Sequence, residues 1–178
     1  MLHAFGFERI GVVVSDLYFV DPRPARGQEG PEQGVRLELR FLERADLPGS
    51  IYSAQPIAVD RPIWRADLLE SVEHPGSLDR AHHHPRFRGW EPGSRKFEPE
   101  LTADPVTWVA ERLADLDTIL DGAEIARDEV GQNDAADLRR AVPEIMAAVR
   151  GSLAGVVAGE LGHPTNATPE AGARAGWL

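Results

Sequence analysis

The chain has 178 residues, of which 42% are hydrophobic and 27% charged, with no cysteine and a formal net charge of −10. The lack of cysteine excludes disulfides, thiolate zinc sites and cysteine nucleophiles, and the acidic balance removes any long-range attraction to nucleic acid. There is neither a basic leader with an apolar core nor a run of about 18 apolar residues, so we expect a cytoplasmic protein without membrane contact.

The first half of the chain has the patterns of strands joined by turns. Residues 9–20 are rich in β-branched and aromatic side chains, and residues 35–42 alternate apolar and polar side chains. Residues 51–59 and 63–72 predict two further strands. Between the first two strands, residues 21–34 contain three prolines and three glycines and predict a flexible surface loop. We therefore expect a curled antiparallel β-meander of about four strands.

The second half changes to a helical period. Asp104 followed by Pro105 predicts a helix start, and apolar side chains recur at three-to-four-residue spacing as far as Leu120. A second amphipathic stripe runs over residues 138–161, and Pro143 within it favours a kink or a late start. The sequence thus predicts an α+β fold in which two C-terminal amphipathic helices follow the meander.

These patterns divide the chain into three parts. Residues 1–132 are predicted to form an α+β core domain, with the flexible loop at 21–34. Residues 133–161 are predicted to form a C-terminal helical arm, and residues 162–178 a disordered tail. Three glycines spaced by four residues near the end of the arm allow another backbone to approach closely. We therefore predict docking of a protein partner, or self-association, through residues 134–161.

A basic stretch separates the two halves and is the candidate functional region. Residues 79–97 carry five cations and two acids, on a chain whose overall charge is −10. Arginine forks suit phosphate or carboxylate, and interleaved aromatic side chains suit stacked bases. The predicted substrate- or anion-binding residues are Arg80, Arg86, Arg88, Trp90, Arg95 and Lys96. In the alternative interpretation, these arginines pair with nearby acids and the aromatic side chains fill the core.

Three consecutive histidines, His82, His83 and His84, stand in this stretch before Pro85, which favours extended backbone at His84. In an extended segment His82 and His84 point to the same side, with α-carbons roughly 6.5–7 Å apart, and can share one metal ion. The candidates for a third ligand are Asp67, Glu73, His74 and Asp79. The sequence requires no cofactor; a divalent metal is one option, and a hydrogen-bonding structural role for the histidines is the alternative.

General acid–base chemistry is a further hypothesis for the same residues. A histidine beside arginines and an acid is readily tuned to titrate near neutrality. Cleavage of RNA needs a base for the 2′-hydroxyl, an acid for the leaving oxygen and a cation for the phosphate. The predicted catalytic residues are His82, His83, His84 and Asp79.

A short segment of the form D-x-A-x-H-H-P follows the predicted meander and precedes aromatic and basic residues and a helix. The segment consists of Asp79, Ala81, His83, His84 and Pro85. Over residues 35–120, this order of elements resembles the TumE-type toxins of bacterial toxin–antitoxin modules. The resemblance implies a ribonuclease, that is, a phosphodiester hydrolase, acting on RNA or another phosphate-bearing ligand. The alternative is a non-catalytic α+β binding or assembly module whose C-terminal helix docks a partner.

Overall fold

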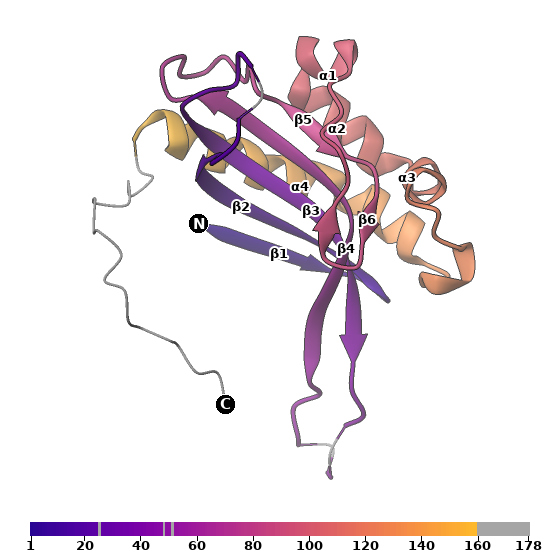
Figure 1. Ribbon diagram of the computed structural model, residues 1–178. Helices are drawn as coiled ribbons and strands as arrows, with labels where there is room; N and C mark the ends of the chain where they lie inside the picture. The colour runs from indigo at the N-terminus through magenta and orange to yellow at the C-terminus, as the bar shows by residue number, and fades with distance from the viewer. Residues whose placement is uncertain (25, 48, 51, 160–178) are drawn as a thin grey trace.

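The computed structural model describes residues 1–24, 26–47, 49–50 and 52–159, and shows an antiparallel sheet with helices on one face (Figure 1). The sheet has the order β1 (Leu2–Gly6), β2 (Ile10–Val20), β3 (Pro31–Arg44), β4 (Ile57–Ser71) and β5 (His82–His84). A small hairpin consists of β6 (Phe87–Arg88) and β7 (Glu91–Pro92). The helices are α1 (Pro99–Ala103), α2 (Pro105–Ala114), α3 (Leu116–Ala123) and α4 (Asp134–Val157), with a 3₁₀ turn at Arg127–Glu129. The predicted α+β class, a meander followed by helices, is confirmed.

The strand boundaries differ from those that the sequence predicts. The expected strands at 51–59 and 63–72 are one strand, β4, which starts at Ile57 and continues through Pro62. Pro62 lies within the strand and does not form a turn. It is tolerated there because the register between β3 and β4 shifts at this point, so its missing N–H interrupts no regular series of hydrogen bonds. The edge strands β1 and β5 were not predicted, and β3 begins at Pro31, inside the expected loop.

Alternation along the strands places apolar side chains on the face that the helices cover. Val35, Leu37 and Leu39 of β3 are fully buried there, and Trp64 of β4 stacks on Trp108 of α2, with ring centroids 6.2 Å apart. The helices supply the other half of this core with Leu101, Val109, Leu113, Ile119, Leu120, Leu138, Ile145, Met146 and Val149. The sheet and its helices therefore share one continuous hydrophobic core.

Helices α2 and α3 begin where the capping residues indicate. The Asp104 side chain accepts a hydrogen bond from the Thr107 N–H at 3.0 Å, as its position before Pro105 predicts. Asp115 accepts from the Thr118 N–H at 3.2 Å, and so starts a separate helix, α3, within the single helix that was expected. The last helix begins at Asp134 and contains Pro143 in its interior rather than near a late start.

Two further features complete the fold. The ends of β3 and β4 extend beyond the rest of the sheet as a projecting hairpin (Figure 1). None of the helices in the described ranges combines the length and apolar character that crossing a bilayer requires. The predicted tail at 162–178 lies outside the described residues.

Candidate metal centre

The face of the sheet opposite the helices carries two rows of charged and imidazole side chains. Cross-strand pairing places Arg36, Asp67 and His82 in one row over β3, β4 and β5. The next row consists of Glu38, Arg65 and His84. The two rows follow from the same alternation that buries Val35 and Leu37 on the other face, since successive strand residues point to opposite sides.

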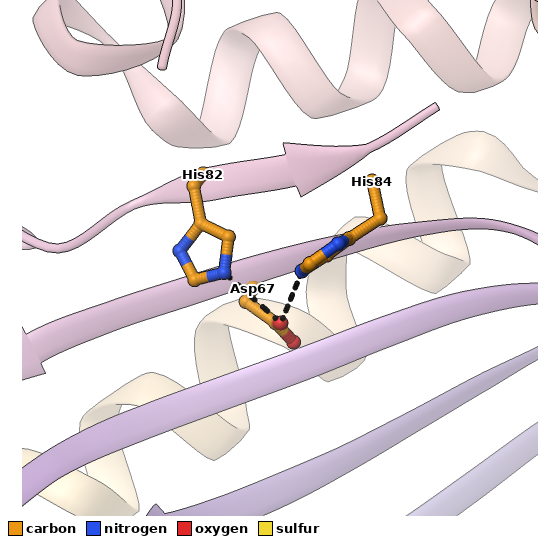
Figure 2. A group of neighbouring side chains, drawn as sticks. All are labelled: Asp67, His82 and His84. Carbon is orange, nitrogen blue, oxygen red and sulfur yellow. Dashed lines mark ion pairs between the residues drawn. The ribbon is translucent and has the colours of Figure 1, made fainter. Parts of the chain in front are cut away.

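Asp67 is the centre of this polar cluster, and its side chain is only 1% exposed. Its Oδ1 accepts a hydrogen bond from Arg36 Nε at 2.7 Å. Its Oδ2 lies 3.1 Å from Arg65 Nε, 3.4 Å from His82 Nε2 and 3.6 Å from His84 Nε2. Arg36 Nη2 also donates to Oδ2, at 3.4 Å. Two arginines and two imidazoles therefore surround the carboxylate, and Figure 2 shows the two imidazoles directed toward one of its oxygens.

The electrostatics of the cluster keep Asp67 ionised. Burial by itself raises the pKa of this carboxyl group. The imidazoles of His82 and His84 and the guanidinium of Arg36 outweigh that effect and hold the pKa well below its ordinary value. Burial also lowers the pKa of Arg65, although the adjacent Asp67 carboxylate opposes the shift. The negative charge of the Asp67 carboxylate thus faces both imidazoles.

The two ring nitrogens of His82 both face oxygen acceptors. Nδ1 lies 2.8 Å from the Arg80 carbonyl oxygen, and Nε2 faces Asp67 Oδ2. A neutral imidazole has only one N–H, so donation to the carbonyl leaves a lone pair on Nε2 directed at a carboxylate. The His82 Nε2 atom therefore calls for a proton or a metal ion between it and Asp67.

The environment of His84 is similar but includes a donor. Its Nδ1 lies 2.7 Å from the Gly93 carbonyl oxygen and donates to it, which leaves Nε2 as an acceptor. Arg65 Nη2 donates to that Nε2 at 3.0 Å. Both His82 and His84 therefore have Nδ1 fixed by a backbone carbonyl and Nε2 directed inward, the orientation that metal-binding histidines usually have.

The distances in this cluster fit metal ligands better than direct ion pairs. Charge-assisted N–H···O bonds measure about 2.7–2.9 Å, whereas the two Nε2 to Oδ2 distances are 3.4 and 3.6 Å. A tetrahedral ion with bonds of about 2.0–2.1 Å separates its ligand atoms by about 3.3–3.4 Å. Asp67, His82 and His84 each offer one ligand atom, all within 4.8 Å of one another. Two histidines and a carboxylate suit first-row transition metals.

His83 lies on the opposite face, among the helices. Its Nδ1 accepts from Trp64 Nε1 at 3.3 Å, and its Nε2 lies 2.9 Å from Glu98 Oε1, to which it donates. Its ring contacts Trp108, with centroids 4.9 Å apart. Burial lowers the pKa of His83, although Glu98 opposes the shift. The structure therefore separates this residue from the other two predicted catalytic histidines.

Asp79, the fourth predicted catalytic residue, lies in the turn between β4 and β5. It accepts a hydrogen bond from the Ser71 N–H at 2.9 Å and lies 3.2 Å from His74 Nδ1. Burial raises the pKa of Asp79, but these contacts outweigh that effect and lower the pKa. Asp79 thus orients His74 and makes no ion pair with His82 or His84 within the described part of the chain.

Two of the predicted anion-binding arginines are paired with a buried acid. Arg80 and Arg95 both approach Glu32 Oε1, at 3.5 and 3.4 Å, and Arg95 also pairs with Asp21 at 3.6 Å. Glu32 is 1% exposed, so this group is an internal ion network rather than an open anion site. Arg80 and Arg95 therefore follow the alternative interpretation, in which the arginines pair with acids instead of binding an anion.

The other predicted anion-binding residues lie at the surface around the β6–β7 hairpin. Arg86 pairs with Glu124 of the α3 cap, and Arg88 and Lys96 are exposed. Trp90 is 61% exposed. The guanidinium carbon of Arg40 lies over its ring, 5.0 Å from the Trp90 ring centroid. The aromatic side chain does not fill the core.

Arg36, Glu38, Arg65 and Glu32 belong to the polar cluster but were not predicted as site residues. Their signal in the sequence is the alternation of charged and apolar side chains along 35–42 and 63–72. That pattern is typical of a strand with one solvent-exposed face.

Comparison of the chain with protein-family models, with curated proteins and with solved structures found no match.

Proposed function

We propose that the protein binds one divalent transition-metal ion through Asp67, His82 and His84. The observation that carries this proposal is His82, whose two ring nitrogens both face oxygen atoms. A metal ion on Nε2 satisfies the imidazole and the carboxylate together, with Nδ1–H donated to a carbonyl. Zn²⁺ is the simplest occupant, because imidazole and carboxylate are among its usual ligands.

The surroundings favour a structural ion over a hydrolytic one. Asp67, His82 and His84 are between 1% and 4% exposed, and the Phe97 ring packs 5.5 Å from the His82 ring. The ion would join β5, a strand of three residues at the sheet edge, to the long strand β4. This role agrees with a non-catalytic α+β binding module whose sheet edge is fastened by metal.

Arg65 is the natural competitor of the metal ion. It donates to His84 Nε2, and its buried Nε lies 3.1 Å from Asp67 Oδ2 as an ion pair whose geometry makes no hydrogen bond. Glu38 offers it another position, with Oε1 already 3.9 Å from Arg65 Nη1. Metal binding would therefore move Arg65 from His84 toward Glu38, and removal of the guanidinium should strengthen metal binding.

The test is a zinc titration of untagged, chelator-treated protein by isothermal calorimetry. We expect one site with a Kd below about 1 μM. His82→Gln and His84→Gln should each weaken binding by at least about 100-fold, since each removes a ligand. Arg65→Met should tighten it, and the variant keeps Glu38 paired, because Arg40 Nη1 lies 2.5 Å from Glu38 Oε2.

Two matched controls separate this site from other imidazoles. His74→Gln removes an exposed histidine, and His83→Gln removes a buried one on the other face of the same strand. Both should bind zinc as the wild type does. Absence of a 1:1 site in the wild type, or unchanged binding in both His82→Gln and His84→Gln, would overturn the proposal and leave a protonated His82 as the account of the geometry.

The ribonuclease activity that the TumE resemblance implies stays a prediction. Its acid and base would have to be reached by a phosphodiester, whereas His82, His83 and His84 are all at most 5% exposed. Asp79 contacts His74 rather than these histidines. The geometry thus favours metal binding, and assay of RNA cleavage by wild type and His82→Gln/His84→Gln protein would decide whether the activity exists.

A further inference from the structure

A surface pocket of about 580 Å³ lies beside the β6–β7 hairpin. Its walls come from the hairpin, from the segment 93–96 that follows it and from Gly122 of α3. The charged side chains that line it are Arg86, Arg88, Glu91 and Lys96, and Ser94 adds a hydroxyl group. Three cations against one acid make this pocket basic on a chain whose net charge is −10.

The cations of this pocket differ from those elsewhere in the basic stretch. Arg80 and Arg95 are held by the buried Glu32, whereas within the described residues Arg88 and Lys96 form no ion pair. Both are exposed, so their charges are available to a ligand from solution. Arg86 also lines the pocket, although Glu124 shares its charge.

Strand β5 fixes part of the pocket wall through hydrogen bonds. His84 Nδ1 donates to the Gly93 carbonyl at 2.7 Å, and the Gly93 N–H donates to the Arg86 carbonyl at 2.9 Å. His83 and Lys96 exchange two backbone hydrogen bonds, of 3.0 and 2.9 Å. A ligand bound here would therefore contact a wall that is already fixed to the sheet. Binding would cost little entropy for ordering the backbone.

We propose that this pocket binds a phosphate group, held by Arg88 and Lys96 with Arg86 and Ser94 beside them. Arginine supplies a planar fork of donors and lysine a compact charge, the two cationic groups that proteins use for phosphate. The site uses different side chains from the proposed metal site, because none of its charged residues is a candidate metal ligand, although His84 also holds Gly93 of the pocket wall.

The probes are inorganic phosphate and adenosine 5′-monophosphate, titrated separately into untagged protein at low ionic strength. We expect a Kd below about 1 mM for at least one probe, and at least about tenfold weaker binding by Arg88→Gln/Lys96→Gln. Tighter binding of the nucleotide than of phosphate would place the ligand among nucleotides, while equal binding would indicate the phosphate group alone.

The matched control is Arg23→Gln/Arg26→Gln, which removes two exposed cations that do not line the pocket. It should bind both probes as the wild type does. The proposal fails if the wild type binds neither probe at about 10 mM, or if both double variants lose affinity equally, which would indicate a general charge effect. Zinc binding of Arg88→Gln/Lys96→Gln protein should be unchanged, so a failure here and a failure of the metal site are distinguishable.

Discussion

The two faces of the sheet are built by alternate residues of the same strands but are held together by different forces. On the helix side, Leu37 and Trp64 pack against apolar helix residues. On the other side, Arg36 and Arg65 form ion pairs with Asp67, and Arg65 also contacts Phe87 of the small hairpin. Apolar burial needs no particular partner, whereas a buried charge is stable only if its partners are in place.

Neighbouring histidines on β5 show the contrast within one strand. His83 on the helix side has a donor at one nitrogen and an acceptor at the other, so its neutral form is satisfied. His82 on the polar side faces acceptors at both nitrogens. A run of histidines in the sequence therefore does not distinguish a packed histidine from a metal ligand. The groups that face each ring nitrogen make that distinction.

Loss of packing on the helix side should have the largest effect. Trp64→Ala removes a side chain that is 2% exposed and contacts both Trp108 and His83. We expect a decrease of about 4 kcal/mol in the free energy of unfolding, measured by urea denaturation. A decrease below about 1 kcal/mol would mean that this face is not the main source of stability.

Loss of the central charge on the polar side should follow closely. Asp67→Asn leaves Arg36 and Arg65 without their shared carboxylate, and we expect a loss of about 3 kcal/mol in chelator-treated protein. The control is Asp117→Asn, an exposed acid paired with Arg127, which should change stability by less than about 0.5 kcal/mol. Equal effects in the two variants would remove the distinction between buried and surface ion pairs.

Much of the contrast between the faces could be predicted from the sequence. Alternation in 35–42 identified both faces of β3, and an extended segment before Pro85 was expected to put His82 and His84 on one side. The choice of Asp67 among four candidate ligands could not be made from the sequence, because it depends on the register that sets Asp67 opposite His82.

Other parts of the cluster were beyond sequence patterns for physical reasons. A strand of three residues, β5, is too short to show a period of two. Arg65 appears in the sequence as a solvent-facing residue, since nothing local indicates that Phe87 of a distant hairpin lies 5.7 Å from its guanidinium. Arg80 and Arg95 were grouped with Arg88 by sequence proximity, although Glu32, far away in the chain, neutralises only the first two.

At the end of the polar face, Asp79 provides a weaker, pH-dependent contribution. Burial raises its pKa, but the Ser71 N–H, His74, Ser77 and Arg80 together lower it below the ordinary 3.8. A carboxyl group with a lowered pKa stabilises the fold above its unfolded-state pKa, and this contribution is lost as the pH falls through the folded-state value. The stability difference between wild type and Asp79→Asn should therefore be constant near neutral pH and shrink below about pH 4. A difference that grows on acidification would contradict this sign.

The smallest effect is expected at the tip of the hairpin that covers the polar face. Trp90 is 61% exposed, and its ring contacts the Arg40 guanidinium. Trp90→Ala should lower the free energy of unfolding by only about 0.5 kcal/mol, the contribution of an exposed cation–π contact, with a Tm within a few degrees of wild type. Thermal unfolding followed by far-UV circular dichroism measures this directly. A loss of 3 kcal/mol or more, as for a core tryptophan, would show that the hairpin is packed into the fold and that the polar face, like the helix side, depends on apolar burial.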